Sequence, residues 1–499
     1  MAKGTNVLIL QCDQLNASVL SCYGGPVKAK HLERLCSKSI RFTAAYCPTP
    51  VCSPSRASFI TGLYPHRHGI TSNVMRMDYP ICGGPATEEG ITAADTTTEK
   101  ILFQKGYRTG HYGKWHLSGE DLPYYPDMYR EHYEYEADCA APFKQAMELP
   151  AEQRMDWYNW QLPVQVDEKL KAAAKNIKEP WKSLPRLHDF YSKIGRLDMD
   201  EKDTFDYRVA QKGIDFLKRN KPGTPFMLTC SFNWPHDPNV IVSPYYEMVD
   251  PADIDCSIDL PCDPLFMAEL SKEIPQQAGP DFLREFLRVY YASVLFIDAQ
   301  VGRVLQALDE SGERDNTLVL FCADHGDMAG GHGMFWKSTS AFYEEVARVP
   351  LLLSYPPLGQ GDFSGLANLV DIMPTILELT GAECPPDLDG ESLVPYMGGQ
   401  AAGRAAVRDA GERATLSERL DWAPGNRRAV HSKDAKERFM LRYKDYKYCY
   451  YTGGKEILYD LEKDPSEYDN KANAPEYAET LRSMREKLRA HLAKSGYAL

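Results

Sequence analysis

The sequence predicts an α/β protein with a doubly wound, mostly parallel sheet flanked by helices, and a smaller C-terminal α+β domain of an antiparallel sheet plus a helix. Two observations carry this prediction. Short apolar runs alternate with an amphipathic helical pattern over most of the chain, and a tyrosine-rich alternating pattern follows near the C-terminus. A chain of 499 residues is also too long for one small core, so two domains are expected.

Four apolar runs are the candidate strands of the large sheet. They are short, rich in branched or aromatic residues and nearly free of charge, as buried parallel strands are. Their ranges are Asn6 to Gln11, Pro225 to Phe232, Asn316 to Ala323 and Val349 to Tyr355. Between two of them, Phe296 to Leu308 places its apolar residues on one helical face and ends at Ser311-Gly312. Strand and helix therefore alternate, which favours a doubly wound sheet.

We expect the larger α/β domain to occupy residues 1–400 and the C-terminal subdomain residues 401–499. The segment 439–461 alternates like β-strands about a Gly453-Gly454 turn. A helical pattern follows, with Leu481, Met484, Leu488 and Leu492 on one face.

A tyrosine-rich stretch at about 122–205 is predicted to be an insertion in the larger domain. Such insertions often line a substrate entrance, where aromatic rings would stack on a sugar or aryl group. The alternative, an insertion that packs on itself or on another subunit, is equally compatible with its composition.

Composition excludes several function classes. The net charge of −13 gives no nucleic-acid footprint, and no apolar stretch is long enough to span a membrane. The N-terminus, MAKGTNVLILQCDQ, enters a strand-like run rather than a signal peptide. Thirteen cysteines without framework spacing favour reduced thiols in the cytoplasm, whereas a signal peptide removed beforehand would favour a periplasmic or secreted protein.

Polar side chains follow three of the predicted strands. An isolated aspartate at such a position is usually a turn or helix cap. Here, however, the carboxyl ends of three strands meet at one sheet edge, where ligands gather in folds of this class. The residues are Asp13 and Gln14, then Asn233, Pro235, His236 and Asp237, then Asp324, His325 and Asp327.

The segment CSPSRASFITG, at residues 52–62, predicts a short helix from about Pro54 to Thr61. Ser53 suits its N-cap, Pro54 its first position and Gly62 its left-handed exit. The helix N-terminus would direct free N–H groups at the surroundings of Cys52, and Arg56 would add a full charge. An anion pocket around a thiol is one interpretation, and a buried cysteine before an ordinary capped helix is the other.

Two lysines have neighbours that would remove them from water. Lys114 lies among Tyr112, Trp115 and Leu117, and Lys337 follows Met334, Phe335 and Trp336. Most lysines are solvated at the surface, but an ammonium placed among apolar groups needs a charged partner. Structural roles are expected for His66, Arg67, His68, Asp298 and His332.

Four segments carry a family resemblance. Residues 52–62 resemble the signature of the type I, formylglycine-dependent sulfatases of the alkaline phosphatase superfamily, in which the leading cysteine is oxidised to formylglycine. GYRTGHYGKWHLSG at 106–119 is similar to the second sulfatase signature, NWPHDP at 233–238 to the histidine segment, and ADHGDMAGGHGMFWK at 323–337 to the stretch that binds metal and sulfate. The similarity covers most of the chain apart from about 125–205 and 400–430.

The resemblance implies hydrolysis of a sulfate ester, a sulfated carbohydrate or another small sulfate monoester, with formylglycine from Cys52 as nucleophile. The implied catalytic residues are Cys52, Arg56, Lys114, His116, His236 and Lys337. Of these, the implied substrate-binding residues are Lys114, His236 and Lys337. One divalent metal is implied, calcium first and manganese or magnesium as alternatives, with the ligands Asp13, Gln14, Cys52, Asp324 and His325.

The implied partners are the sulfate ester and a formylglycine-generating maturation enzyme; a homo-oligomer stays open. Many sulfatases carry two adjacent aspartates after the first strand, whereas this chain has Cys12-Asp13-Gln14. The pattern looks more like the choline-sulfatase and phosphonate-monoester-hydrolase branch. A phosphonate monoester or phosphodiester hydrolase with the same apparatus is therefore one alternative. A non-catalytic binding protein of the same fold is the other. Five intact residues argue against it: Cys52, Arg56, Lys114, His236 and Lys337.

Overall fold

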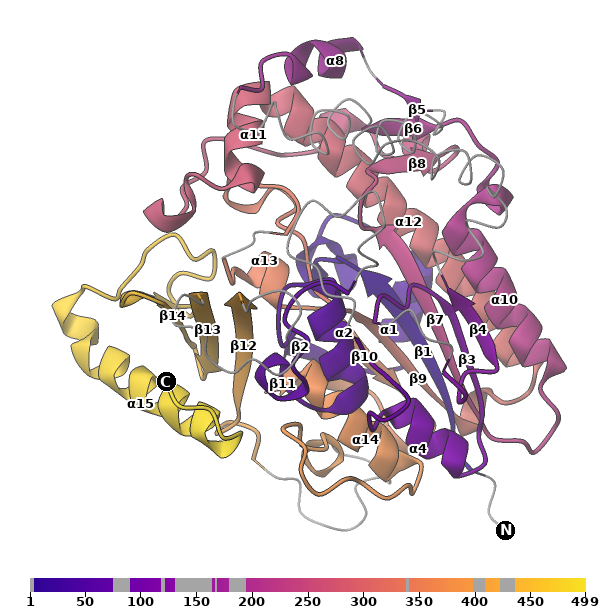
Figure 1. The fold of residues 1–499 in the computed structure, drawn as a ribbon. Helices are drawn as coiled ribbons and strands as arrows, with labels where there is room; N and C mark the ends of the chain where they lie inside the picture. Colours follow the sequence, from indigo (N-terminus) through magenta and orange to yellow (C-terminus); the bar gives the residue numbers. More distant parts are fainter. Residues whose placement is uncertain are drawn as a thin grey trace, which may run out of the picture.

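The computed structural model describes residues 4–74, 90–117, 122–130, 164–166, 168–178, 194–337, 341–397, 409–421 and 436–499. Over these residues the chain forms an eight-stranded sheet between two layers of helices, and a separate four-stranded sheet with a terminal helix (Figure 1). The predicted α/β class with a C-terminal α+β unit is confirmed.

The large sheet has the strand order β11-β2-β10-β9-β1-β7-β3-β4. β1 lies between β7 and β9, pairs in parallel with both and is buried along its whole length. This central position explains its continuous apolar sequence, since both faces of the strand are covered. The strands are β1 (Asn6–Asp13), β2 (Ile40–Tyr46), β3 (Arg108–Gly113), β4 (Asp127–Arg130), β7 (Phe226–Pro235), β9 (Thr317–Ala323), β10 (Leu351–Ser354) and β11 (Gly361–Asn368).

All four predicted runs are strands, but the direction of the last was predicted wrongly. β10 pairs antiparallel with both β9 and β2, whereas β1, β7 and β9 run in parallel. A strand buried on both faces has the same apolar sequence in either direction. Its direction depends on the connection, and a parallel connection usually needs a full crossover helix. The described helices between β9 and β10 are only the short η9 (Gly331–Gly333) and α13 (Glu344–Ala347).

Helices cover both faces of the sheet. α1 (Lys30–Cys36), α10 (Phe205–Arg219) and α12 (Pro280–Glu310) pack together on one face, and α2 (Cys52–Thr61), α4 (Thr98–Gln104) and α14 (Ile372–Leu379) on the other (Figure 1). The helix predicted at 296–308 is the second half of α12, and Ser311 is its C-cap. Asp298 accepts hydrogen bonds from the N–H groups of His31 and Leu32 at the start of α1, which confirms its structural role.

A small layer lies above the carboxyl ends of the sheet strands (Figure 1). It contains the sheet β5 (Val164–Gln165), β6 (Gly195–Leu197) and β8 (Val240–Val242), with α8 (Glu168–Ala174) and α11 (Leu270–Ala278). The tyrosine-rich segments 131–163 and 179–193 lie outside the described residues, so the predicted substrate entrance stays a prediction. Tyr124 and Tyr125 are buried, and Tyr125 packs against Trp115.

The C-terminal unit is the predicted antiparallel sheet with a helix. Its elements are β12 (Ala414–Asp421), β13 (Lys436–Tyr443), β14 (Tyr446–Tyr451), β15 (Lys455–Asp460) and α15 (Ala478–Lys494). Gly453 and Gly454 join β14 to β15 with positive φ angles, and α15 buries the four predicted apolar residues. The boundary near residue 400 stays a prediction, because residues 398–408 lie outside the described parts.

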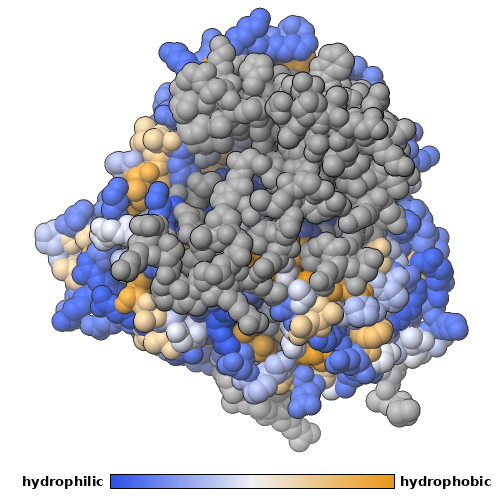
Figure 2. Space-filling model, viewed as in Figure 1, coloured by the Kyte–Doolittle hydropathy of each residue, from blue (hydrophilic) through white to orange (hydrophobic). Residues whose placement is uncertain are grey.

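The surface is mainly polar where it can be seen. Figure 2 shows hydrophilic residues along both margins of the view, with hydrophobic residues scattered among them. Within the described ranges, no helix is long and apolar enough to cross a membrane. The exposed large hydrophobic side chains found there are Phe103, Met248, Met267, Tyr468 and Leu499. The expected homo-oligomer and cytoplasmic location stay predictions.

Candidate active site

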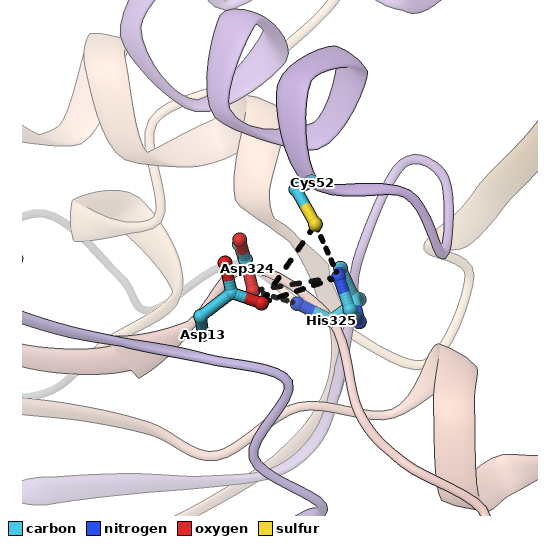
Figure 3. A group of neighbouring side chains, drawn as sticks. All are labelled: Asp13, Cys52, Asp324 and His325. Carbon is cyan, nitrogen blue, oxygen red and sulfur yellow. Dashed lines mark hydrogen bonds and ion pairs between the residues drawn. The ribbon is translucent and has the colours of Figure 1, made fainter. Parts of the chain in front are cut away.

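The predicted strand-end residues meet at one edge of the large sheet. Asp13 is the last residue of β1, His236 follows β7, and Asp324 and His325 follow β9. Because these three strands are parallel neighbours, their carboxyl ends lie together. The N-terminus of α2 carries Cys52 to the same place (Figure 3).

Helix α2 begins two residues earlier than predicted. Cys52 is its first residue, Val51 is the N-cap, and no side chain caps the helix. The predicted cap Ser53 is therefore wrong. Its hydroxyl lies inside the first turn, where it donates to the His116 carbonyl at 2.5 Å and accepts from Val74 N at 3.0 Å. The predicted left-handed exit at Gly62 is confirmed, with φ of 68°.

Four side chains form a compact, fully buried group. The potential ligand atoms of Asp13, Cys52, Asp324 and His325 all lie within 4.8 Å of one another (Figure 3). Cys52 Sγ lies 3.2 Å from His325 Nε2 and 3.7 Å from Asp13 Oδ1. His325 Nδ1 lies 2.9 Å from the Gly326 carbonyl, a geometry in which Nδ1 carries the proton and Nε2 faces the group as a potential ligand.

Arg56 holds the two carboxylates rather than an incoming anion. It is 2% exposed, and its guanidinium donates to Asp324 Oδ2 at 2.7 Å and to Asp13 Oδ2 at 3.4 Å. The prediction that its charge belongs to an anion pocket is thus not supported by its contacts. Its remaining partners are Gln11 Oε1 at 3.2 Å, the Lys114 carbonyl at 2.9 Å and Ser231 Oγ at 2.8 Å.

The two carboxylates have opposite electrostatic surroundings. Burial and the Cys52 thiolate oppose ionisation of Asp13, but Lys114, His236 and Arg56 outweigh them and lower its pKa. Burial and the neighbouring Asp13 raise the pKa of Asp324 despite Arg56. Asp13 and Asp324 are so close that full ionisation of both carboxylates requires further positive charge near them.

Gln14 lies beside this group and contributes an oxygen. Its backbone N–H donates to Asp324 Oδ1 at 3.1 Å, and its Nε2 donates to Asp327 Oδ2 at 2.6 Å. Its Oε1 is buried and has no hydrogen-bond partner among the described residues. A buried amide oxygen without a partner is costly unless something binds it. Together with two carboxylates and an imidazole nitrogen, this oxygen fits a divalent cation.

Two lysines and a histidine face the group from the other side. Lys114 Nζ lies 2.5 Å from Asp13 Oδ2, so the expected charged partner of this buried lysine is found. Lys337 Nζ lies 3.1 Å from Cys52 Sγ and 3.3 Å from His236 Nε2. Burial opposes ionisation of the Cys52 thiol, but Lys337, Lys114, His325 and a hydrogen bond from His116 lower its pKa well below the usual value.

The site opens toward His236 and Lys337. Both residues are half-buried, whereas Asp13, Cys52, Asp324 and His325 are fully buried. Burial lowers the pKa of His236 and the charges of Lys114 and Lys337 oppose ionisation as well, but Asp237 and Asp13 favour it, and the net pKa is raised to about 10. A bound anion would therefore meet cationic groups at the open side and the ligand group at the closed side.

The sequence missed several supporting residues. Gln11 and Ser231 contact Arg56 from inside β1 and β7, and a polar residue in an otherwise apolar strand is the signal that could have found them. Tyr290 of α12 donates to the Gln14 carbonyl at 2.7 Å, and nothing in the sequence marks this contact.

The residues given structural roles have structural contacts. His68 Nε2 lies 2.9 Å from Ser58 Oγ, and Arg67 pairs with Asp387 and Asp389. His332 stacks on Tyr343 with ring centroids 3.7 Å apart.

Comparisons with known proteins agree with this geometry. A family model described as Sulfatase matches residues 5–382, and one described as N-sulphoglucosamine sulphohydrolase, C-terminal, matches residues 330–494. The chain is 28% identical over 503 residues to an arylsulfatase of Clostridium perfringens, covering 96% of this chain and 92% of that protein. It is 26% identical over 495 residues to a choline-sulfatase of Rhizobium meliloti, covering 94% and 83%.

Two solved structures share the fold. The phosphonate monoester hydrolase of Agrobacterium radiobacter has a TM-score of 0.73 and 22% identity, covering 98% of this chain and 96% of that chain. A protein in complex with its substrate D-glucosamine-2-N,6-O-disulfate has a TM-score of 0.69 and 19% identity, covering 99% and 98%.

Proposed function

We propose, from the premise that the chain belongs to the sulfatase family of sulfuric ester hydrolases, that it cleaves a sulfate monoester with a formylglycine made from Cys52 and with one divalent metal ion. The observation that carries the proposal is the position of Cys52. Cys52 is the first residue of α2, and its buried thiol lies close to Asp13, Asp324 and His325 and also to Lys337. At this position a nucleophile can be activated on one side, while positive charge on the other side neutralises the sulfate group that it attacks.

The formylglycine and the metal ion would have separate tasks. Formylglycine at position 52 would supply an aldehyde hydrate as the nucleophile. Asp13, Gln14, Asp324 and His325 would hold the metal ion, which would supply Lewis-acid stabilisation of the ester's negative charge. The oxygen-rich set favours calcium, and the imidazole nitrogen keeps manganese, alongside magnesium, as an alternative.

The remaining residues bind, orient and move protons. Lys114 and Lys337 would neutralise sulfate oxygens, and His236 with Lys337 would protonate the departing alcohol oxygen. His116, which hydrogen-bonds Cys52, would accept the proton released as sulfate leaves. Arg56 would act as a positioning residue, since its contacts are with Asp13 and Asp324.

The substrate class we propose is a sulfated carbohydrate or another small sulfate monoester. Similar proteins include an arylsulfatase, a choline-sulfatase and a fold neighbour bound to a disulfated glucosamine, which supports a sulfate ester without choosing among them. A formylglycine-generating enzyme is the partner this function requires.

A phosphonate monoester hydrolase is the second candidate. The Asp13-Gln14 sequence and the fold similarity to such an enzyme favour it as the alternative. Kinetics on a paired aryl sulfate and aryl phosphonate decide between the two. A higher kcat/KM for the sulfate supports the sulfatase, and the reverse order replaces it.

The metal site is tested by measuring bound calcium and manganese in the matured protein. Asp324→Asn should remove stoichiometric metal and activity, because the ion loses a charged ligand. Asp298→Asn is the matched control, since it removes a buried carboxylate from α12, away from the site. Stoichiometric metal in Asp324→Asn would disprove the ligand set.

A further inference from the structure

The histidine that faces the open side of the site has a carboxylate behind it. Asp237 Oδ1 lies 3.0 Å from His236 Nδ1, and the Asp237 carbonyl oxygen lies 2.9 Å from the same nitrogen. The opposite ring nitrogen, Nε2, lies 3.3 Å from Lys337 Nζ. One nitrogen of the ring therefore faces acceptors of its own loop, while the other faces the substrate side of the site.

The charges around this ring come from four parts of the fold. Lys337 reaches it from the loop after β9, Lys114 from the end of β3, Asp13 from β1, and Asp237 from its own loop. The two lysines oppose a charged imidazole, and the two carboxylates favour it. Asp13 is already paired with Lys114 at 2.5 Å and with Arg56 at 3.4 Å. Asp237 is thus the carboxylate in direct contact with the ring.

We propose that Asp237 is a positioning residue: its carboxylate fixes Nδ1–H of His236, turns Nε2 toward the ester and keeps a proton there for the leaving oxygen. This inference rests on the proposed sulfatase function. It deepens that function by naming the group that makes His236 an acid.

The proton balance of the step is simple. The nucleophilic oxygen attacks as the anion, after its proton has gone to water. As it bonds to sulfur, the bond from sulfur to the leaving oxygen breaks, and the electron pair of that bond stays on the leaving oxygen. The leaving oxygen takes the proton from Nε2 and departs as an alcohol. His236 is then neutral, retains Nδ1–H toward Asp237, and regains a proton from water through its half-buried side.

The backbone contact makes the test clean. Because the Asp237 carbonyl also accepts from Nδ1, the ring keeps one orienting hydrogen bond when the carboxylate is neutralised. Asp237→Asn therefore removes charge with little change in shape. The matched control is Asp206→Asn, because Asp206 supports the same loop through its backbone, accepting from Asn233 N at 2.7 Å and Trp234 N at 2.8 Å.

The experiment compares an alkyl sulfate with 4-nitrophenyl sulfate on matured, metal-loaded protein. Asp237→Asn should lower kcat for the alkyl ester by roughly 10-fold to 100-fold and for the nitrophenyl ester by less than about 3-fold. The alkaline limb of kcat should move to lower pH, because the neutral amide no longer favours the charged imidazole. Asp206→Asn should affect both esters alike and leave the limb in place. Equal losses on both esters in Asp237→Asn, with an unmoved limb, would overturn the proposal.

A second readout does not depend on turnover. Nitrogen NMR of the histidines, with the His236 signal identified by its absence in His236→Gln, should show a lower pKa for His236 in Asp237→Asn than in the parent protein. An unchanged titration overturns the proposal even if the enzyme is active. If neither ester is cleaved by the parent protein, the proposed function fails, and the titration still decides whether Asp237 controls His236.

Discussion

Two clusters of buried charge stand at different places in this fold. One is the candidate active site, and the other joins the large domain to the C-terminal sheet. At the junction, Lys447 of β14 lies 2.7 Å from Glu344 Oε1, 2.7 Å from Glu467 Oε1 and 2.8 Å from the Phe342 carbonyl. Two carboxylates and one carbonyl oxygen thus surround its ammonium, and its side chain is fully buried.

The active-site cluster is not closed in this way. Among the described residues, Lys337 Nζ lies 3.1 Å from Cys52 Sγ and 3.3 Å from His236 Nε2 and forms no ion pair with a carboxylate. Gln14 Oε1 is also buried without a partner there, and the cationic side is half-buried. Buried charge alone therefore does not mark a ligand site. The difference lies in whether the protein completes the contacts itself or leaves them for a ligand.

The largest effect that separates the clusters is expected at Cys52. Cys52→Ala should lower kcat by a factor on the order of 10⁴ to 10⁶, the scale on which a lost nucleophile acts. The fold should persist, because Cys52 belongs to the open cluster rather than to the junction. Activity and thermal unfolding of the purified variant check this.

Cys47→Ala is the control, since Cys47 is equally buried and its Sγ lies 3.6 Å from the Val346 carbonyl. It should retain activity. Mass analysis of the Cys52 peptide should show that activity follows the converted fraction, and full activity of wholly unconverted protein would refute the nucleophile.

The next largest effect is expected at the junction and concerns stability. Lys447→Met leaves Glu467 buried without its cation and leaves Glu344 with Arg348 at 3.3 Å, and breaking a buried pair in this way commonly costs about 3–5 kcal/mol. Urea unfolding should show this loss, while kcat of the folded fraction stays within about 3-fold of the parent value, since the closed cluster has no chemical task.

Lys463→Met is the matched control. Lys463 pairs with Asp460, but its side chain is 68% exposed, so its loss should change the free energy of unfolding far less than Lys447→Met does. A large, selective loss of kcat in stably folded Lys447→Met protein would break the distinction between the two clusters.

Lys337 of the active site and Lys447 of the junction also show what the sequence could predict. Lys337 follows Met-Phe-Trp and Lys447 lies within a tyrosine-rich strand, so apolar neighbours indicate burial for both. Their partners come from distant parts of the chain, and only the fold brings them together. Local sequence thus predicts that an ammonium is buried, but not whether its contacts are complete.

The strands of the fold show the same limit: local sequence predicts which segments are buried but not how distant segments pair. β1, β7 and β9 could be predicted because both faces of each strand are buried, and their polar ends predicted the site. β2, β3 and β11 were missed, since IRFTAAY, RTGHYG and GDFSGLAN mix apolar, polar and glycine residues. Their strand structure depends on pairing with neighbours, which propensity does not capture.

A smaller loss of activity is expected at Lys337, and its size should depend on the leaving group of the ester. Lys337→Met should lower kcat about 100-fold on an alkyl sulfate, because positive charge is lost where the leaving oxygen becomes negative. The loss should be much smaller for a nitrophenyl ester, which needs little protonation to depart. Equal losses on both esters would show that Lys337 binds the sulfate uniformly.

The smallest effect concerns a single pair in the closed part of the molecule. His66 in α3 (Pro65–His68) lies with Nδ1 2.8 Å from Glu418 Oε2 of β12 and with Nε2 2.8 Å from Ser495 Oγ. Burial lowers the pKa of His66, but Glu418 outweighs it and raises the pKa above its usual value, with Asp389 adding to the effect and Arg67 opposing it.

Since the folded pKa of His66 is above the unfolded one, its stabilisation is fully present below the unfolded pKa and is lost as pH rises through the folded value. His66→Gln should therefore lower the free energy of unfolding by an amount on the order of 1 kcal/mol at pH 5.5, and by less at pH 9. Urea unfolding at both pH values measures the difference. A destabilisation that stays the same across this range would mean that the pair of His66 and Glu418 contributes through its hydrogen bonds and not through charge.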